Sequence, residues 1–328
     1  MFVAIALLII GLILLSYGAD RLVFSASILC RSFGVPPLII GMTVVSIGTS
    51  LPEIIVAFSA AMHGQIDFSV GTALGSNITN ILLILGVAAL LHPLTIHSNL
   101  IRRELPLMLL VSLLSGIMLF DSHLSRLDGV ALLGMALIYL LAVIRIARRA
   151  ERDNNDTLTR EQLAELPREE SGNGNTVAFL WLAVALVILP MSTRMVIDNA
   201  TVVADFFGMS GLVMGLTVVA VGTSLPELAT VIAGALKGED DIAIGNLIGA
   251  NIYNVAIVQG LPALIHPGNI DPAAFARDYW VMLGVSTLFT LLCLLRSRRI
   301  GRLAGALLLC GFVAWVALLW LQPALVDG

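Results

Sequence analysis

The sequence has little charge: Asp, Glu, Lys and Arg make up only 12% of its 328 residues, whereas 58% are hydrophobic and the mean hydropathy is +0.98. Soluble globular proteins contain about 25% charged residues, so this chain has too few to cover a water-facing surface. Its single lysine, Lys237, lies in no Gly-Lys-Ser/Thr run, which excludes the phosphate-binding loop of an ATPase. The composition therefore predicts a polytopic membrane protein that does not bind ATP.

Other functional classes lack their signatures as well. The net charge is −4 and no basic cluster surrounds aromatic residues, which argues against a nucleic-acid partner. The three cysteines are far apart in the sequence, so neither a disulfide framework nor a zinc site is expected. The chain has no Gly-x-Ser-x-Gly or His-Glu-x-x-His motif, which argues against an intramembrane enzyme.

Ten apolar segments have about the length that crosses roughly 30 Å of hydrocarbon. The predicted spans are residues 2–24, 37–62, 68–91, 105–120, 127–146, 176–197, 211–236, 242–265, 279–295 and 302–321. The polar residues 147–175 separate five spans from five and are predicted to form a solvated linker. The predicted halves are therefore residues 1–146 and 176–328.

The basic residues predict the orientation. If the N-terminus is outside, the inside connections carry 15 of the 18 Lys and Arg residues and the outside keeps 3. Because short cytoplasmic loops are enriched in Lys and Arg, both termini are expected on the outside. For a bacterial inner membrane, this places the termini in the periplasm and the linker 147–175 in the cytoplasm.

The two halves repeat one another at a fixed offset of 174 residues. Gly-Thr-Ser-Leu-Pro-Glu ends at Glu53 and again at Glu227, and 19 of 46 positions are identical between residues 41–86 and 215–260. Since each half has an odd number of spans, the second copy (212–260) enters the membrane from the opposite side to the first (38–86). Inverted repeats with interrupted helices are typical of secondary transporters. The predicted fold is all-α, with ten transmembrane helices in two inverted five-helix repeats.

The repeated motif places one carboxylate in each of two apolar windows. Glu53 is the only charged residue between Leu38 and Met62, and Glu227 is the only one between Leu212 and Leu236. A carboxylate at mid-bilayer costs at least ~3 kcal/mol, so the pair requires a cation or protons. The other carboxylates are expected in loops or towards the ends of spans.

Neighbouring residues supply further oxygen atoms. Pro52 and Pro226 lack an N–H group, so each is expected to break its helix and release backbone carbonyls about four residues earlier. All candidate ligands are oxygens, which suit Ca²⁺ and alkali cations rather than zinc or copper. The candidates are the carboxylates of Glu53 and Glu227, the hydroxyls of Thr49, Thr223, Ser50, Ser224 and Ser76, the amides of Asn77, Asn80, Asn251 and Asn254, and the backbone carbonyls of Ser46 and Ala220.

Some of these residues have structural alternatives. The Ser76 hydroxyl could bond to a carbonyl of its own helix, and Asn77 and Asn251 could join helices rather than bind ions. Two carboxylates neutralise one Ca²⁺ or two Na⁺ ions. A central Ca²⁺ between Glu53 and Glu227 is therefore the simplest charge-balanced occupant.

The duplicated motif, with Gly75-Ser76-Asn77 and Gly249-Ala250-Asn251 downstream, resembles the α-repeats of the Ca²⁺:cation antiporter superfamily, on its sodium/calcium exchanger branch. The resemblance implies Ca²⁺ transport against Na⁺, with the first and sixth helices sliding to switch access. It also implies that Glu53 and Glu227 bind both ions, with Thr49 and Thr223 as further Ca²⁺ ligands. Asn80 and Asn254 would complete the centre, and outer Na⁺ sites would be lined by Ser50, Ser224, Ser76 and the carbonyls of Ser46 and Ala220.

The chain departs from characterised relatives at two positions, with Asn254 where they can carry Asp and Ala250 where they can carry Ser. These changes leave a site charge of −2 and remove one outer hydroxyl. We therefore predict a Ca²⁺/Na⁺ antiporter that needs only the lipid bilayer and its ions, without a cofactor. Ca²⁺/H⁺ exchange is the close alternative, and a passive cation channel is a more distant one.

Overall fold

The computed structural model describes residues 1–33, 46–96, 99–153, 174–294 and 299–321. Helices dominate these residues, and the remaining regular structure is four two-residue strands. In the first half, the elements are α1 (Phe2–Ser32), α3 (Ser46–Thr49), α4 (Leu51–Met62), α5 (Ile66–Thr79), η2 (Asn80–Ile84), α6 (Leu85–Leu91), β1 (Leu94–Thr95), α7 (Asn99–Leu119), β2 (His123–Leu124) and α8 (Arg126–Asp153), where η denotes a π-helix.

The second half follows the same order with additional breaks. Its elements are α10 (Gly174–Phe207), α11 (Gly211–Met214), η3 (Gly215–Val219), α12 (Ala220–Thr223), α13 (Leu225–Lys237), α14 (Asp240–Tyr253), η4 (Asn254–Val258), α15 (Gly260–Ile265), β3 (Gly268–Asn269), η5 (Ala274–Tyr279), α16 (Trp280–Leu294), β4 (Arg299–Ile300) and α17 (Arg302–Leu321).

Every predicted span contains helix in its described residues. Seven helical segments are long and apolar enough to cross a membrane, and an eighth span is formed by Gly211–Thr223 and Leu225–Lys237, which meet at a 45° bend. Two shorter apolar helices, Leu51–Met62 and Glu104–Leu119, match the remaining predicted spans. The predicted ends are less accurate, because α1 continues to Ser32 and α8 continues to Asp153. Residues 37–45 of the second span and 154–173 of the linker lie outside the described residues.

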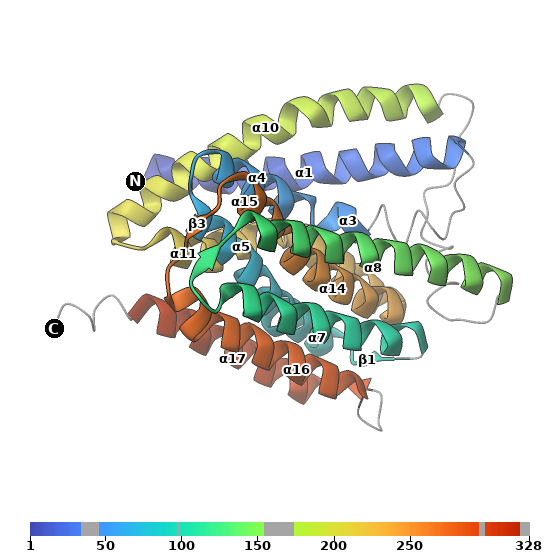
Figure 1. Ribbon diagram of the computed structural model, residues 1–328. Helices are drawn as coiled ribbons and strands as arrows, with labels where there is room; N and C mark the ends of the chain where they lie inside the picture. Colours follow the sequence, from blue (N-terminus) through green and yellow to red (C-terminus); the bar gives the residue numbers. More distant parts are fainter. Residues whose placement is uncertain (34–45, 97–98, 154–173, 295–298, 322–328) are drawn as a thin grey trace.

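The ends of the bundle agree with an even number of crossings. The first residues of α1 and the last residues of α17 lie at one end of the molecule (Figure 1). The end of α8 and the start of α10, which flank the predicted linker, lie at the opposite end.

Two small sheets show the inverted relation between the halves. β1 pairs with β4 through Leu94 and Ile300, and β2 pairs with β3 through Leu124 and Gly268. Leu94 and Gly268 are separated by 174 residues, so the symmetry that relates the halves exchanges the two sheets. The β1 and β3 strands lie at opposite ends of the bundle (Figure 1), as inverted repeats require.

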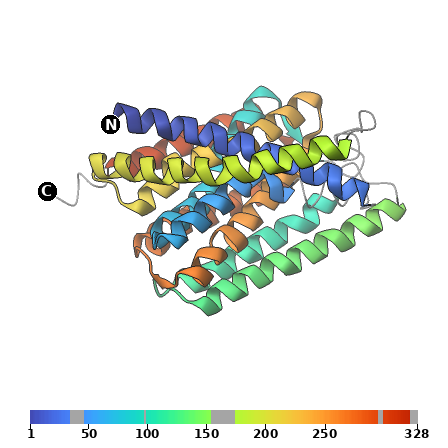
Figure 2. The same ribbon diagram turned by 90° about the horizontal axis from the view of Figure 1, so that it is seen from above.

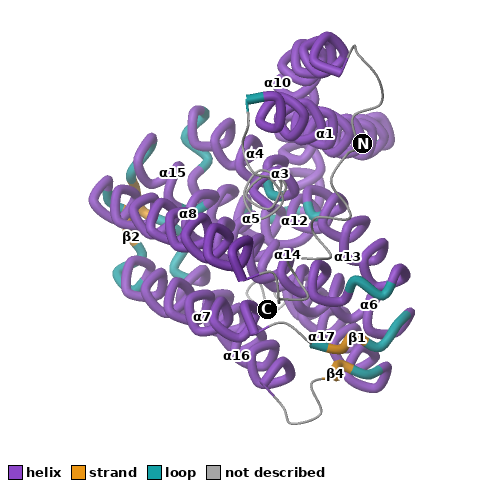
Figure 3. The backbone as a smooth tube through the Cα atoms, turned by 90° about the vertical axis from the view of Figure 1, so that its right-hand side faces the viewer, coloured by secondary structure: helices purple, strands orange, loops and turns teal. Residues whose placement is uncertain are grey.

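The helices form a packed centre and a peripheral pair. α1 and α10 lie side by side along one face (Figure 2), and Figure 3 shows them together outside the bundle that contains α4, α5, α13 and α14. The Arg21 guanidinium carbon lies 5.2 Å from the Trp181 ring centroid and contributes to the contact between α1 and α10. In the centre, a Cβ added at Gly75 would lie 2.4 Å from the Leu216 carbonyl oxygen. Only glycine allows α5 to approach η3 this closely.

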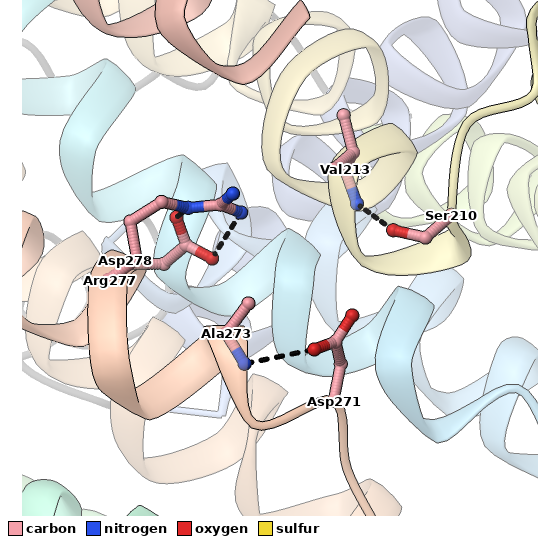
Figure 4. Close-up of polar contacts among 6 residues, drawn as sticks. All are labelled: Ser210, Val213, Asp271, Ala273, Arg277 and Asp278. Atoms are coloured by element: carbon pink, nitrogen blue, oxygen red, sulfur yellow. Dashed lines mark hydrogen bonds and ion pairs between the residues drawn. The ribbon is translucent and has the colours of Figure 1, made fainter. Parts of the chain in front are cut away.

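Polar side chains cap the N-termini of helices at the end of the bundle where the N-terminus of the chain lies. The Ser210 hydroxyl accepts a hydrogen bond from the Val213 N–H at 3.3 Å, and Asp271 Oδ1 accepts one from the Ala273 N–H at 2.9 Å (Figure 4). These bonds satisfy amide groups that the first turn of a helix leaves unpaired. The Arg277 side chain bonds to the neighbouring Asp278 carboxylate, at 2.8 and 3.0 Å.

Candidate functional site

Both copies of the motif break a helix, as the sequence predicts. The first break falls at Ser50, between α3 and α4, and the second falls at Ser224, between α12 and α13. Pro52 and Pro226 lie in the first turn of the following helices, where their missing N–H groups leave the carbonyls four residues earlier without their usual donors. The break therefore follows directly from the proline in each motif.

The peripheral helix α1 contacts both breaks. A Cβ added at Gly48 would lie 2.0 Å from a Val23 methyl group, and one added at Gly222 would lie 2.4 Å from a Leu12 methyl group. The glycine before each break thus leaves room for a side chain of α1. A shift of α1 along its axis would change the packing at both breaks.

The two motif glutamates are fully buried and share a reciprocal contact. The Ser224 hydroxyl donates to Glu53 Oε1 at 2.9 Å, and the Ser50 hydroxyl donates to Glu227 Oε1 at 3.2 Å. Both serines belong to the opposite repeat, so the two breaks interlock at their carboxylates. The second oxygen of each glutamate has no hydrogen-bond donor within the described parts of the chain. Both Oε2 atoms are therefore available to a cation.

The threonines before the breaks each interact with the glutamate of the opposite repeat, Thr49 with Glu227 and Thr223 with Glu53, but their other partners differ. The Thr49 hydroxyl donates to Asn246 Oδ1 on α14 at 3.2 Å. The Thr223 hydroxyl instead bonds within its own helix, to the Val219 carbonyl at 2.9 Å. The Ala220 carbonyl, a candidate ligand, already accepts the Ser224 N–H at 3.1 Å. Ser46 is the first residue of α3, and its side chain lies outside the described ones.

The asparagines of α5, η2 and α14 join the two repeats. Asn77 Nδ2 donates to the Asn251 backbone carbonyl at 3.1 Å, and Asn80 Nδ2 donates to Asn251 Oδ1 at 3.0 Å. The alternative role of Asn77 and Asn251 as inter-helix contacts is therefore present in the structure. The Ser76 hydroxyl and both amide atoms of Asn254 are buried without hydrogen-bond partners among the described residues. The alternative role of Ser76, a bond from its hydroxyl to a carbonyl of its own helix, is not observed.

Several features of this centre escape sequence analysis. The π-helices η2 and η4 begin at Asn80 and Asn254, and such turns often occur at functional sites. Asn246 was not among the predicted site residues, although it follows Gly245 in the repeated motif. Its first-half counterpart is Thr72, so the position is polar in both copies but the residue is not repeated.

The site can supply two carboxylates and several neutral oxygens. No group of three or more His, Cys, Asp or Glu side chains that could hold a metal ion occurs in the described residues. The two carboxylates and the neighbouring hydroxyl, amide and carbonyl oxygens are ligands of the kind that hard cations accept.

Other carboxylates lie near span ends, as expected, but some are more buried than that position implies. Glu104 on α7 is 4% exposed and Asp278 on η5 is 0% exposed. The two residues are 174 positions apart, so they form a second symmetry-related pair of buried acids. Each residue directly precedes the apolar run of its helix, and neighbouring helices bury it.

Comparison with known proteins identifies the family. The model of the "Sodium/calcium exchanger protein" family matches residues 3–145 and 177–321. The chain belongs to this family. It is 64% identical over 328 residues, all of both chains, to "Inner membrane protein YrbG" of Escherichia coli (strain K12). It is also 30% identical to "Sodium/calcium exchanger MaX1" of Methanosarcina acetivorans, covering 96% of this chain and 97% of that one.

A solved structure shows the same fold. The sodium-calcium exchanger NCX_Mj, soaked with 2.5 mM Na⁺ and 0.1 mM Ca²⁺, superimposes with a TM-score of 0.65 at 29% identity, covering 97% of this chain and 98% of that one. The fold of two inverted repeats and the membrane-spanning helices are thus consistent with membership of the exchanger family. The protein is a multi-pass membrane transporter of the sodium/calcium exchanger family.

Proposed function

We propose that the protein exchanges Ca²⁺ for Na⁺ by alternating access, with Ca²⁺ bound at mid-membrane between Glu53 and Glu227. The observation that carries this proposal is the reciprocal Ser–Glu contact, which brings two fully buried carboxylates together and leaves one oxygen of each without a donor. An isolated buried charge is costly, so the pair requires a cation or protons.

The charges and ligands support competition between the two ions. Ca²⁺ takes six to eight oxygens, for which Glu53, Glu227, Thr49 and Thr223 are the central candidates. The same two carboxylates neutralise two Na⁺ ions, so occupancy by one ion displaces the other. Asn80 and Asn254 would complete this central site. The outer Na⁺ positions would be lined by the hydroxyls of Ser50, Ser224 and Ser76 and by the backbone carbonyls of Ser46 and Ala220.

Movement of the peripheral helix pair would switch access. α1 contacts the glycine before each break and packs along α10, outside the bundle that holds the glutamates. Sliding of α1 and α10 would expose one side of the site while covering the other. We further propose a bacterial inner-membrane location with both termini in the periplasm and the linker 147–175 in the cytoplasm. In this arrangement the halves 1–146 and 176–328 are the two inverted five-helix repeats of the transporter.

Proton-driven exchange is the second candidate. Asn254 is neutral, so the centre contains only two carboxylates, and two protons neutralise them as two Na⁺ ions do. Both reactions would use the same Glu53–Glu227 pair.

The test is uptake of radioactive Ca²⁺ into proteoliposomes that contain the full chain. We expect uptake when Na⁺ is loaded inside and diluted outside. Uptake driven by a pH gradient without Na⁺ would instead identify the proton as the coupling ion. Ca²⁺ movement without dependence on any counter-ion gradient would contradict antiport and indicate a channel.

A further inference from the structure

The two halves of the site present different polar residues on equivalent helix faces. On α5 and η2 the face carries Thr72, Ser76 and Asn80, which are spaced four residues apart. The equivalent positions on α14 and η4, each 174 residues later, are Asn246, Ala250 and Asn254. The second face therefore lacks a hydroxyl at its centre and has an amide one turn earlier.

Asn246 is oriented towards the site, whereas its counterpart is not. Asn246 Oδ1 accepts the Thr49 hydroxyl across the repeat interface at 3.2 Å, and the residue is 7% exposed. Its Nδ2 atom has no hydrogen-bond acceptor within the described ranges. By contrast, the Thr72 hydroxyl bonds to the Phe68 carbonyl of its own helix at 2.8 Å. The amide oxygen of Asn246, which can bind a cation through its second lone pair, is thus held beside Thr49 at the first break.

The contacts of Asn246 link it to one glutamate in particular. Thr49 and Ser50 are adjacent at the first break, and the Ser50 hydroxyl donates to Glu227. The side chain of Thr49 also interacts with that carboxylate. One carboxylate, two hydroxyls and one amide oxygen therefore meet on this side of the site.

We propose that the Asn246 amide oxygen is a ligand for the coupling cation on the Glu227 side, where it takes the place of the hydroxyl that Ala250 lacks. One carboxylate with neutral oxygens gives a single negative charge, which suits a monovalent hard cation such as Na⁺. Ala250 has no side-chain oxygen, and Asn246 supplies one from the preceding helical turn. This inference rests on the proposed function and adds a selectivity residue to it.

The experiment measures the Na⁺ dependence of Ca²⁺ uptake by the full chain in proteoliposomes. In Asn246→Ala, the Na⁺ concentration for half-maximal uptake is expected to rise about tenfold, as expected for loss of one neutral ligand to a charged group. Adding Ala250→Ser to that variant returns the hydroxyl and is expected to restore most of the Na⁺ affinity. Thr72→Ala is the matched control at the symmetry-related position, and its Na⁺ dependence is expected to follow the wild type.

A binding measurement separates this inference from the proposed function. The midpoint of thermal unfolding of detergent-solubilised protein is followed as NaCl is added, with choline chloride as the ionic-strength control. We expect Na⁺ to stabilise the wild type at lower concentrations than Asn246→Ala. If Na⁺ stabilises the wild type at lower concentrations than Asn246→Ala but drives no Ca²⁺ uptake, the proposed function fails while the ligand role of Asn246 is still supported.

Two results would overturn the inference. The first is a Na⁺ dependence of Asn246→Ala equal to that of the wild type in both measurements. The second is that Asn246→Ala loses Ca²⁺/Na⁺ exchange and Ca²⁺/Ca²⁺ exchange to the same extent, and that adding Ala250→Ser restores neither. That pattern would indicate that the Asn246 amide has a structural role.

Discussion

The two halves of the site are alike at their carboxylates and unlike at the neighbouring helix faces. Each glutamate accepts a serine hydroxyl from the opposite repeat, whereas the amides behave unequally: Asn80 donates to Asn251, and Asn254 has no partner within the described chain. Symmetric carboxylates allow one site to be presented to either side of a membrane. The unequal amides and hydroxyls around them can then distinguish the ions without disturbing that symmetry.

The largest expected effect comes from removing either carboxylate. Glu53→Gln and Glu227→Gln should each reduce Ca²⁺ exchange by about 100-fold or more, because each removes one of the two negative charges that offset the charge of a buried Ca²⁺. The measurement is radioactive Ca²⁺ uptake by proteoliposomes under a Na⁺ gradient. Equal losses in the two variants are expected from the reciprocal contact.

Glu104→Gln provides the control for this pair. Glu104 is also buried on a helix, but it lies at the start of α7 outside the motif. Its neutralisation is expected to leave exchange in place. Substantial uptake by either Glu53→Gln or Glu227→Gln would contradict the site.

The contact between the two repeats can be tested through its glycines. Gly75→Ala places a methyl carbon 2.4 Å from the Leu216 carbonyl oxygen, closer than van der Waals contact allows, so α5 and η3 must separate. We expect a loss of about 1–3 kcal/mol in the free energy of unfolding, typical of overpacking. Thermal unfolding in detergent measures it.

Gly134→Ala on α8 is the matched control. An added Cβ there meets no atom within 4 Å, and alanine favours helix over glycine by up to about 1 kcal/mol. This variant should be at least as stable as the wild type. Equal stability of the two alanine variants would show that the close approach of α5 and η3 is not needed.

Much of the architecture is predictable because the bilayer imposes strong local constraints. Span lengths, the 174-residue repeat and the positions of Pro52 and Pro226 lead to the inverted fold and to both helix breaks. The isolation of Glu53 and Glu227 within apolar windows predicts two buried carboxylates. Each of these signals depends on residues close together in the chain.

The features that were not predicted depend on which helices become neighbours. The bond between Thr49 and Asn246 joins residues 197 positions apart, and no local pattern encodes that pairing. The burial of Glu104 likewise depends on the helices that pack against this part of α7. The π-helical turn at Asn254 has no signal in the apolar residues that follow it. Tertiary packing thus determines what helix periodicity cannot.

The serines test whether the reciprocal contact is equivalent on both sides. Ser50→Ala and Ser224→Ala each remove one hydroxyl donor to a buried carboxylate, a contact that is typically worth about 1.5–3 kcal/mol. We expect the Ca²⁺ concentration for half-maximal uptake to rise about tenfold in both variants. A change in only one of them would show that the two halves already differ at the glutamates.

The smallest effect separates the two asparagines that begin the π-helices. Asn80→Ala removes the donor to Asn251 Oδ1 and leaves a buried acceptor unpaired, which costs about 1–3 kcal/mol. Asn254→Ala removes a side chain of the same size but breaks no hydrogen bond within the described residues. Since the cavities are similar, the difference in free energy of unfolding between the variants isolates the hydrogen bond. Thermal unfolding without Ca²⁺ should show Asn80→Ala as the less stable; the reverse order would mean that Asn254 supports the fold rather than serving an ion.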